Sequence, residues 1–132
     1  MPTKTPEELL QLAAQTAQNA HAPYSKFHVG SALETEDGTV FTGCNVENAS
    51  YGLTICGERN AIFQMVASGQ RKISQIAVVA GGDVPPYPCG ACRQVINEFA
   101  DPDCPVYVAP TQRIDQYETM TLGQLLPKSF KL

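Results

Sequence analysis

The sequence predicts a three-layer α/β/α sandwich, in which one five-stranded mixed sheet carries helices on both faces. Three observations predict this fold class. Helical and strand patterns alternate in the second half of the chain, an Asp37-Gly38 pair separates two strand patterns in the first half, and segment 73–80 is almost continuously apolar. The chain has 132 residues, the size of one ordinary domain, so we expect a single domain over residues 1–132.

The first helix is expected over residues 6–19. Thr5 and Glu8 form a capping-box pattern, and Pro6 suits the first turn of a helix. Apolar side chains then recur at helical spacing and would form the buried stripe: Leu9, Leu10, Ala13, Ala14 and Ala17.

A β-hairpin should follow the first helix. Its strands are expected over residues 27–34 and 39–46, on either side of Asp37-Gly38, a pair typical of tight hairpin turns. Residues 47–55 are mostly small and polar, which indicates a loop.

Helices and strands alternate from residue 56 onward. Helices are expected over residues 56–67 and 89–100, with strands at 73–80, 106–109 and 117–121 and a short helix at 122–126. Because a helix connects the strands at 73–80 and 106–109, these two strands should be parallel. The intervening loop 81–88 contains three prolines.

Composition narrows the possible partners and location. The formal net charge is -4, which argues against binding that depends on neutralising phosphates, so no nucleic-acid partner is expected. The longest apolar run, residues 76–80, is far too short to span a bilayer, and residues 1–12 lack a secretory pattern. We therefore expect a cytoplasmic protein without a membrane contact, whose five cysteines serve as ligands, nucleophiles or core residues rather than disulfides.

Three cysteines carry the candidate chemistry. Cys89 and Cys92 lie one helical turn apart at a predicted helix start, and Cys56 lies at another. A single buried strand links these helices, so both helix N-termini should open at the same sheet edge and bring the three thiols together. Zinc prefers thiolate ligands, and a tetrahedral site with three protein ligands keeps one position for water.

Glu58 and Arg59 follow the first cysteine directly. Glu58 is two residues beyond a predicted ligand, where its carboxylate suits a general acid/base. Arg59 would offset the negative charge of three thiolates around one divalent cation. Other interpretations remain open: a thiol–disulfide pair at Cys89 and Cys92, a structural zinc with a fourth ligand such as His28, or core thiols, the interpretation favoured for Cys44 and Cys104.

The combination of Cys-x-Glu with Pro-Cys-x-x-Cys is already known from the zinc-dependent deaminases. At these residues the chain resembles the cytidine deaminase family, specifically its small homotetrameric type, and the resemblance covers nearly the whole chain. Segments 22–27 (APYSKF) and 42–51 (TGCNVENASY) are similar to the family as well. Cysteine rather than histidine at position 56 is similar to the free-nucleoside enzymes and unlike the tRNA adenosine and deoxycytidylate deaminases.

The resemblance implies an activity and a cofactor. The activity would be hydrolytic deamination of free cytidine and 2'-deoxycytidine to uridine and 2'-deoxyuridine, with release of ammonia, as part of pyrimidine salvage. It implies one Zn²⁺ per subunit held by Cys56, Cys89 and Cys92, with Glu58 catalytic and Arg59 bonded to the ligand sulfurs. Deamination of another cytosine-bearing small molecule is the alternative within the same fold.

The resemblance also implies a set of substrate contacts. Asn45 and Glu47 would bond the ribose 3'-hydroxyl, and Phe27 would stack on the base. The backbone N–H of Gly57 would meet the base O2. Tyr51 and Phe130 would reach into a neighbouring subunit's site, so a homotetramer with shared active sites is expected.

Two positions depart from the family pattern. Gly57 stands where alanine is usual, and His28 stands where proline is common. Gly57 keeps the backbone donor but allows a looser turn, and His28 could shift the stacking of Phe27 on the base.

Overall fold

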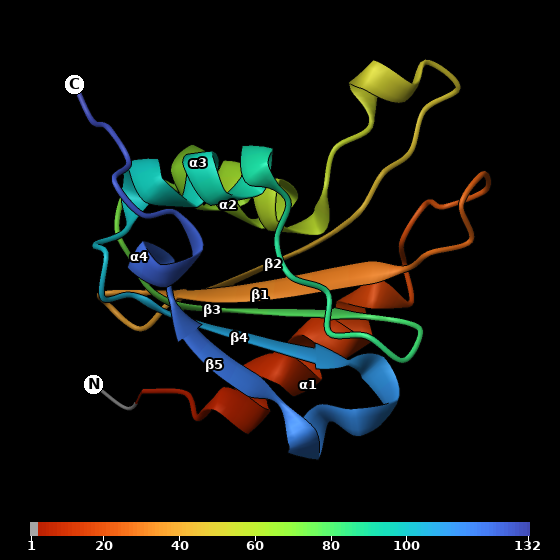
Figure 1. Cartoon of the computed structure of the whole chain (residues 1–132), viewed down its shortest axis with the longest axis horizontal. Coiled ribbons are helices and arrows are strands. Elements are labelled where there is room, and N and C mark those ends of the chain that lie inside the picture. Colours follow the sequence, from red (N-terminus) through yellow and green to blue (C-terminus); the bar gives the residue numbers. More distant parts are fainter. Residues whose placement is uncertain (1–2) are drawn as a thin grey trace.

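The computed structural model describes residues 3–132 and shows a three-layer arrangement (Figure 1). The central sheet has five strands in the order β2-β1-β3-β4-β5. One face is covered by α1, and α2 and α3 lie side by side on the other. The elements are α1 (Pro6–Ala17), β1 (Val29–Thr35), β2 (Val40–Cys44), η1 (Tyr51–Leu53), α2 (Gly57–Ala67), β3 (Ile73–Ala80), α3 (Gly90–Phe99), β4 (Pro105–Pro110), η2 (Thr111–Gln116), β5 (Glu118–Thr121) and α4 (Leu122–Leu125).

Helix α1 begins with the predicted capping box. The Thr5 hydroxyl accepts the Glu8 N–H at 3.1 Å, and the Glu8 carboxylate accepts the Thr5 N–H at 2.8 Å. The helix ends at Ala17, two residues before the predicted end, and buries four of its five predicted apolar residues: Leu9, Leu10, Ala13 and Ala17. It packs so closely on β1 that a Cβ on Gly30 would lie 1.9 Å from the Ala13 carbonyl oxygen, so only glycine fits there.

The hairpin forms around Asp37-Gly38, as predicted. Strands β1 and β2 are antiparallel, and Gly38 adopts a φ of 87°, which a side chain would disfavour. Strand β1 begins at Val29, so the prediction that Phe27 and His28 belong to it is wrong. The strand is also buried on nearly its whole length, because it lies in the middle of the sheet between β2 and β3.

The topology places two helix N-termini at one edge of the sheet. Strands β2 and β3 both pair antiparallel with β1, so they point the same way and end at the same edge. Helix α2 follows β2 in the chain, and α3 follows β3. Strands β3 and β4 are parallel, as predicted, and β5 pairs antiparallel with β4, which makes the sheet mixed.

Two apolar cores hold the layers together. The larger one lies between the sheet and the helices α2 and α3 and includes Ile62, Met65 and Ile96. The smaller one lies under α1. Among the described residues, none of the helices combines the length and the apolar character that a bilayer-spanning segment requires.

Candidate metal centre and active site

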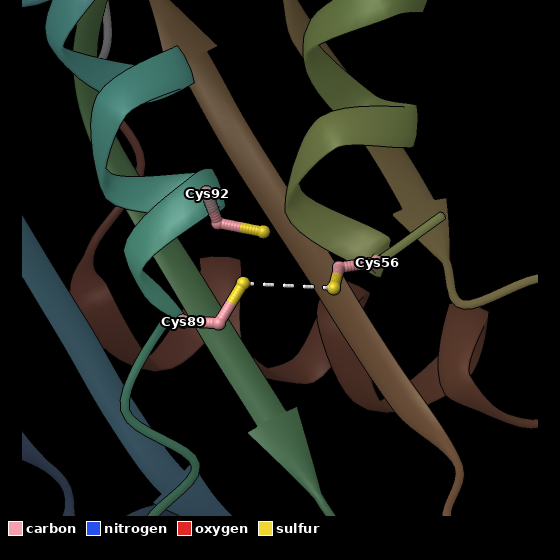
Figure 2. A group of neighbouring side chains, drawn as sticks. All are labelled: Cys56, Cys89 and Cys92. Carbon is pink, nitrogen blue, oxygen red and sulfur yellow. Dashed lines mark hydrogen bonds between the residues drawn. The ribbon is translucent and has the colours of Figure 1, made fainter. Parts of the chain in front are cut away.

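Three thiols converge where α2 and α3 begin. Figure 2 shows the sulfurs of Cys56, Cys89 and Cys92 pointing toward one another from these two helices. The three Sγ atoms all lie within 4.8 Å of one another, and those of Cys56 and Cys89 are 3.9 Å apart. Cys56 and Cys89 are the N-cap residues, with extended backbone, rather than the first helical residues that the sequence predicted. The predicted meeting of three thiols is therefore confirmed.

The donor set fits zinc. Three thiolates are ligands that zinc prefers, and helix N-termini favour their negative charge. Within residues 3–132, no fourth His, Cys, Asp or Glu joins this cluster, and His28 lies outside it. Three protein ligands are typical of catalytic zinc, whereas structural sites have four.

Arg59 supplies positive charge to the thiol cluster. Its Nη2 donates a hydrogen bond to the Cys56 sulfur at 3.4 Å. Hydrogen bonds from Cys92 and from Arg59 lower the pKa of Cys56 to about 5. The Arg59 side chain thus stabilises the thiolate form, which is the form that binds metal.

Glu58 is a buried carboxyl group beside the thiols. It is 4% exposed, and its Oε1 has no hydrogen-bond partner among residues 3–132. Burial raises the pKa of Glu58 to about 7, and the charge of the Cys56 thiolate adds to the effect. A buried polar atom without a partner is costly, so this oxygen is suited to meet a ligand or a water molecule.

Cys56, Cys89 and Glu58 line a cavity of about 790 Å³, the size of a small-molecule site, whereas Cys92 is buried and does not line it. Its wall combines residues from both halves of the chain: Ser25, Phe27, Val29, Asn45, Glu47, Thr54, Cys56, Glu58, Val78, Gly81, Gly82, Asp83, Val84, Pro85, Pro86, Tyr87 and Cys89. The carboxyl groups in this wall come from Glu47, Glu58 and Asp83, and the part of the chain that the structure describes adds no Lys, Arg or His to it.

Asn45 and Glu47 line the cavity and hold its rim in shape. The Asn45 side chain accepts the Val29 N–H at 2.9 Å and donates to the Phe27 carbonyl at 2.8 Å. Glu47 accepts the Ser25 hydroxyl and the backbone N–H groups of Tyr24 and Ser25, bonds that lower its pKa. Both side chains are therefore held in place by the chain around them.

The other predicted site residues lie outside this wall. Gly57 is buried beneath the site, and a Cβ there would lie 3.3 Å from the Gly43 carbonyl oxygen. Tyr51 and Tyr24 line an adjacent hollow, and their ring centroids are 6.2 Å apart. Phe130 is 68% exposed, near the C-terminus.

Sequence reasoning missed one wall of the cavity, and it left the role of Arg93 open between support of the last ligand and exposed helix surface. Residues 81–87 were interpreted only as a loop, although their prolines immediately before Pro-Cys-x-x-Cys were a signal. Arg93 follows Cys92 directly on α3. Its side chain donates to the carbonyls of Pro88 at 2.6 Å and Leu125 at 2.9 Å, so it anchors the peptide that leads into Cys89.

The remaining cysteines stand apart from the thiol cluster. Cys104 is buried in the larger core, as predicted, where desolvation raises its pKa to about 12. Cys44 is only half-buried, because it is the last residue of the edge strand β2. The prediction that it is a core thiol is therefore only partly right.

Comparison with known proteins agrees with this site. Residues 3–108 match the sequence model of the cytidine and deoxycytidylate deaminase zinc-binding region. The chain is 46% identical to cytidine deaminase from Sporosarcina psychrophila over 124 residues, 94% of this chain and 90% of that protein. It is also 46% identical to cytidine deaminase from Halalkalibacterium halodurans over 92% of this chain and 91% of that protein.

Solved structures give the same result. The crystal structure of cytidine deaminase from Burkholderia pseudomallei matches with a TM-score of 0.91 at 46% identity, covering 96% of this chain and 100% of that one. Cytidine deaminase from Mycobacterium tuberculosis matches with a TM-score of 0.79 at 39% identity, covering 94% and 95%. The fold, the three converging thiols and these matches together show that the chain belongs to the cytidine and deoxycytidylate deaminase zinc-binding family.

Proposed function

We propose that this protein hydrolytically deaminates free cytidine and 2'-deoxycytidine to uridine and 2'-deoxyuridine, releasing ammonia for pyrimidine salvage. The observation that carries the proposal is the buried carboxyl of Glu58 beside three converging thiols, with Glu58 and two of these thiols lining one cavity. The curated relatives named cytidine deaminase support the choice of base.

The charge of the cavity favours a nucleoside over a nucleotide. The family includes enzymes that act on deoxycytidylate, which carries a phosphate. Glu47 and Asp83 line the cavity, and its described wall has no basic side chain. A phosphate there would meet carboxylates and no cation, which disfavours binding.

Zinc would be held by Cys56, Cys89 and Cys92, one ion per subunit. Bound zinc supplies the Lewis acidity that makes water give up a proton near neutral pH. Glu58 takes that proton and delivers it to N3 of the base as the nucleophile adds to C4. The same carboxyl then takes the proton of the new C4 hydroxyl and gives it to the amino group, so that the C4–N bond breaks, ammonia departs and the C4 carbonyl of uridine remains. Arg59 holds the Cys56 thiolate through its hydrogen bond.

The placement of Phe27, Asn45 and Glu47 around the cavity supports the proposed substrate contacts. Phe27, 45% exposed, offers a ring on which the base stacks. Asn45 and Glu47 bond the ribose 3'-hydroxyl with the hydrogen-bonding capacity that remains after their contacts within the chain. The N–H of Gly57, the first residue of α2, donates to the base O2.

The homotetramer belongs to the same proposal. Tyr51 and Phe130 are 77% and 68% exposed and lie outside the cavity wall of their own chain. Large exposed aromatic side chains favour a contact with another subunit, where they would complete the neighbour's site. The whole chain would act as one catalytic domain per subunit, and its five free cysteines favour a reducing, cytoplasmic location.

Ammonia release from purified, zinc-loaded protein tests the proposal. Cytidine, 2'-deoxycytidine, deoxycytidine monophosphate and cytosine are offered in parallel, with and without a zinc chelator. We expect turnover of both nucleosides, little turnover of the monophosphate, and loss of activity with the chelator that zinc restores. The proposed function would be contradicted if only the monophosphate were deaminated, or if a wider panel of substrates showed activity only on another cytosine compound.

A further inference from the structure

The cavity wall made by residues 81–87 is the part of the site least fixed by the sheet. This segment connects β3 to Cys89, and Gly82, near its start, has a φ of 99°. Its only described backbone hydrogen bonds are from Gly81 to the His28 carbonyl at 3.4 Å and from Tyr87 to the Pro85 carbonyl at 3.0 Å. Side-chain contacts must therefore contribute to its position.

Two such contacts come from outside the site. The Tyr87 hydroxyl donates to the carboxylate of Glu118, at 2.8 and 2.9 Å from its two oxygens. The Arg113 guanidinium donates to the Asp83 carbonyl at 3.1 Å and lies 3.6 Å from the Asp83 carboxylate. Arg113 belongs to η2 and Glu118 to β5. Both elements follow β4 in the chain, and the connection between them lies at the end of the sheet where the segment after β3 turns back toward α3 (Figure 1).

We propose that Glu118 is a positioning residue for substrate binding, which acts through the Tyr87 hydroxyl to hold the 81–87 wall against the nucleoside. Glu118 does not line the cavity, whereas Tyr87 does. The inference rests on the proposed function, because it assigns this wall to the binding of cytidine.

The stiffness of the segment makes one contact effective. Pro85, Pro86 and Pro88 restrict the backbone around Tyr87, so holding the Tyr87 hydroxyl also fixes its neighbours. Val84 and the two prolines that follow it line the cavity between the points held by Asp83 and Tyr87. Glu118 begins a strand that is itself bonded to β4, so the anchor belongs to the sheet.

The expected effect is on binding rather than on chemistry. Tyr87→Phe keeps the ring and removes only the hydroxyl, and Glu118→Ala removes only the acceptor. Each should raise the KM for cytidine about three- to tenfold, as expected for one exposed, charge-assisted hydrogen bond, with kcat and zinc content near wild type. Glu118→Gln keeps an acceptor and should fall between wild type and Glu118→Ala.

A double-substitution cycle separates this role from a general structural one. If Tyr87 and Glu118 act through one hydrogen bond, Tyr87→Phe combined with Glu118→Ala should raise KM no more than the larger single effect. Hydrogen–deuterium exchange should become faster in residues 81–88 of each variant and stay unchanged elsewhere.

Matched controls are available on the same chain. Glu98→Gln removes an exposed carboxylate on α3, and Tyr117→Phe removes a hydroxyl that has no hydrogen bond within residues 3–132. Both should keep the wild-type KM. Provided that the wild type is active, Tyr87→Phe and Glu118→Ala variants with the wild-type KM would overturn the role of Glu118. So would a double variant in which the two single effects on KM multiply. A wild type inactive on cytidine would instead refute the proposed function.

Discussion

Arg59 and Cys56 are joined by an N–H···S hydrogen bond of 3.4 Å across the first turn of α2. The guanidinium is half-buried, and its Nε has no partner among residues 3–132. This pairing places one permanent positive charge beside three thiols that must lose their protons to bind metal. Arg59 therefore supports the ligand set without being a ligand.

Replacing Arg59 by glutamine should weaken metal retention. The substitution removes the charge that favours the Cys56 thiolate, and partners of metal ligands typically contribute about 10- to 100-fold in affinity. Competition with a chromophoric chelator measures the change. Arg71→Gln is the matched control, since within residues 3–132 Arg71 donates only to the carbonyls of Val66 and Gln70. Equal zinc affinities in the two variants would exclude the supporting role.

Glu58→Gln should separate metal binding from turnover. Glutamine has nearly the same shape and cannot exchange the proton, so kcat should fall about 100- to 10,000-fold while zinc content stays at one per subunit. Metal analysis and ammonia release on the same preparation check both parts. Turnover close to that of wild type would remove Glu58 from the proton transfer.

Gly43→Ala should destabilise the protein and disturb the site. A Cβ at Gly43 would lie 2.4 Å from the Ala61 nitrogen and 2.5 Å from the Gly57 oxygen, so α2 must move away from β2. Overpacking of this kind costs about 1 to 3 kcal/mol of unfolding free energy, measured by denaturant titration. Gly52→Ala, which meets no atom within 4 Å, is the control and should change stability little. A fully stable Gly43→Ala would show that α2 is not packed this closely.

Asp37 should make the hairpin sensitive to acid. Its carboxylate accepts hydrogen bonds from the Thr35 hydroxyl, the Thr39 N–H and the Gln70 amide. These bonds, led by that of Thr35, lower the pKa of Asp37 from its ordinary value of 3.8. Because the folded pKa is the lower one, the stabilisation is fully present above pH 3.8 and is lost as the pH falls through the folded pKa.

The Asp37→Asn variant tests this dependence. It should melt below wild type at pH 7, and the difference should shrink as the pH falls below 3.8. Comparing the two proteins at each pH cancels the loss of metal from protonated thiols, which affects both. Asp115→Asn, at an exposed carboxylate without a described hydrogen bond, should not differ from wild type at either pH. A difference between Asp37→Asn and wild type that does not change with pH would count against the assigned bonds.

The sequence predicted the layers, the parallel pair of strands and the meeting of three thiols, because these follow from periodicity and chain direction. It placed the start of β1 two residues early, because Phe27 and His28 continue the alternation, although the Phe27 carbonyl bonds the Asn45 side chain rather than a neighbouring strand. It could not find the Tyr87–Glu118 contact, since these residues are 31 positions apart and Tyr87 lies in a loop without a periodic pattern. Long-range contacts of side chains in loops leave no local signal.

Strand β3 separates Cys56 from Cys89 along the chain, so the two sulfurs meet only after β3 has inserted beside β1. An ion bound by both would close a loop that encloses α2 and β3 and would oppose their unravelling. Newly synthesised protein should therefore bind zinc tightly only once the sheet is assembled, and the time of zinc binding would mark the completion of folding.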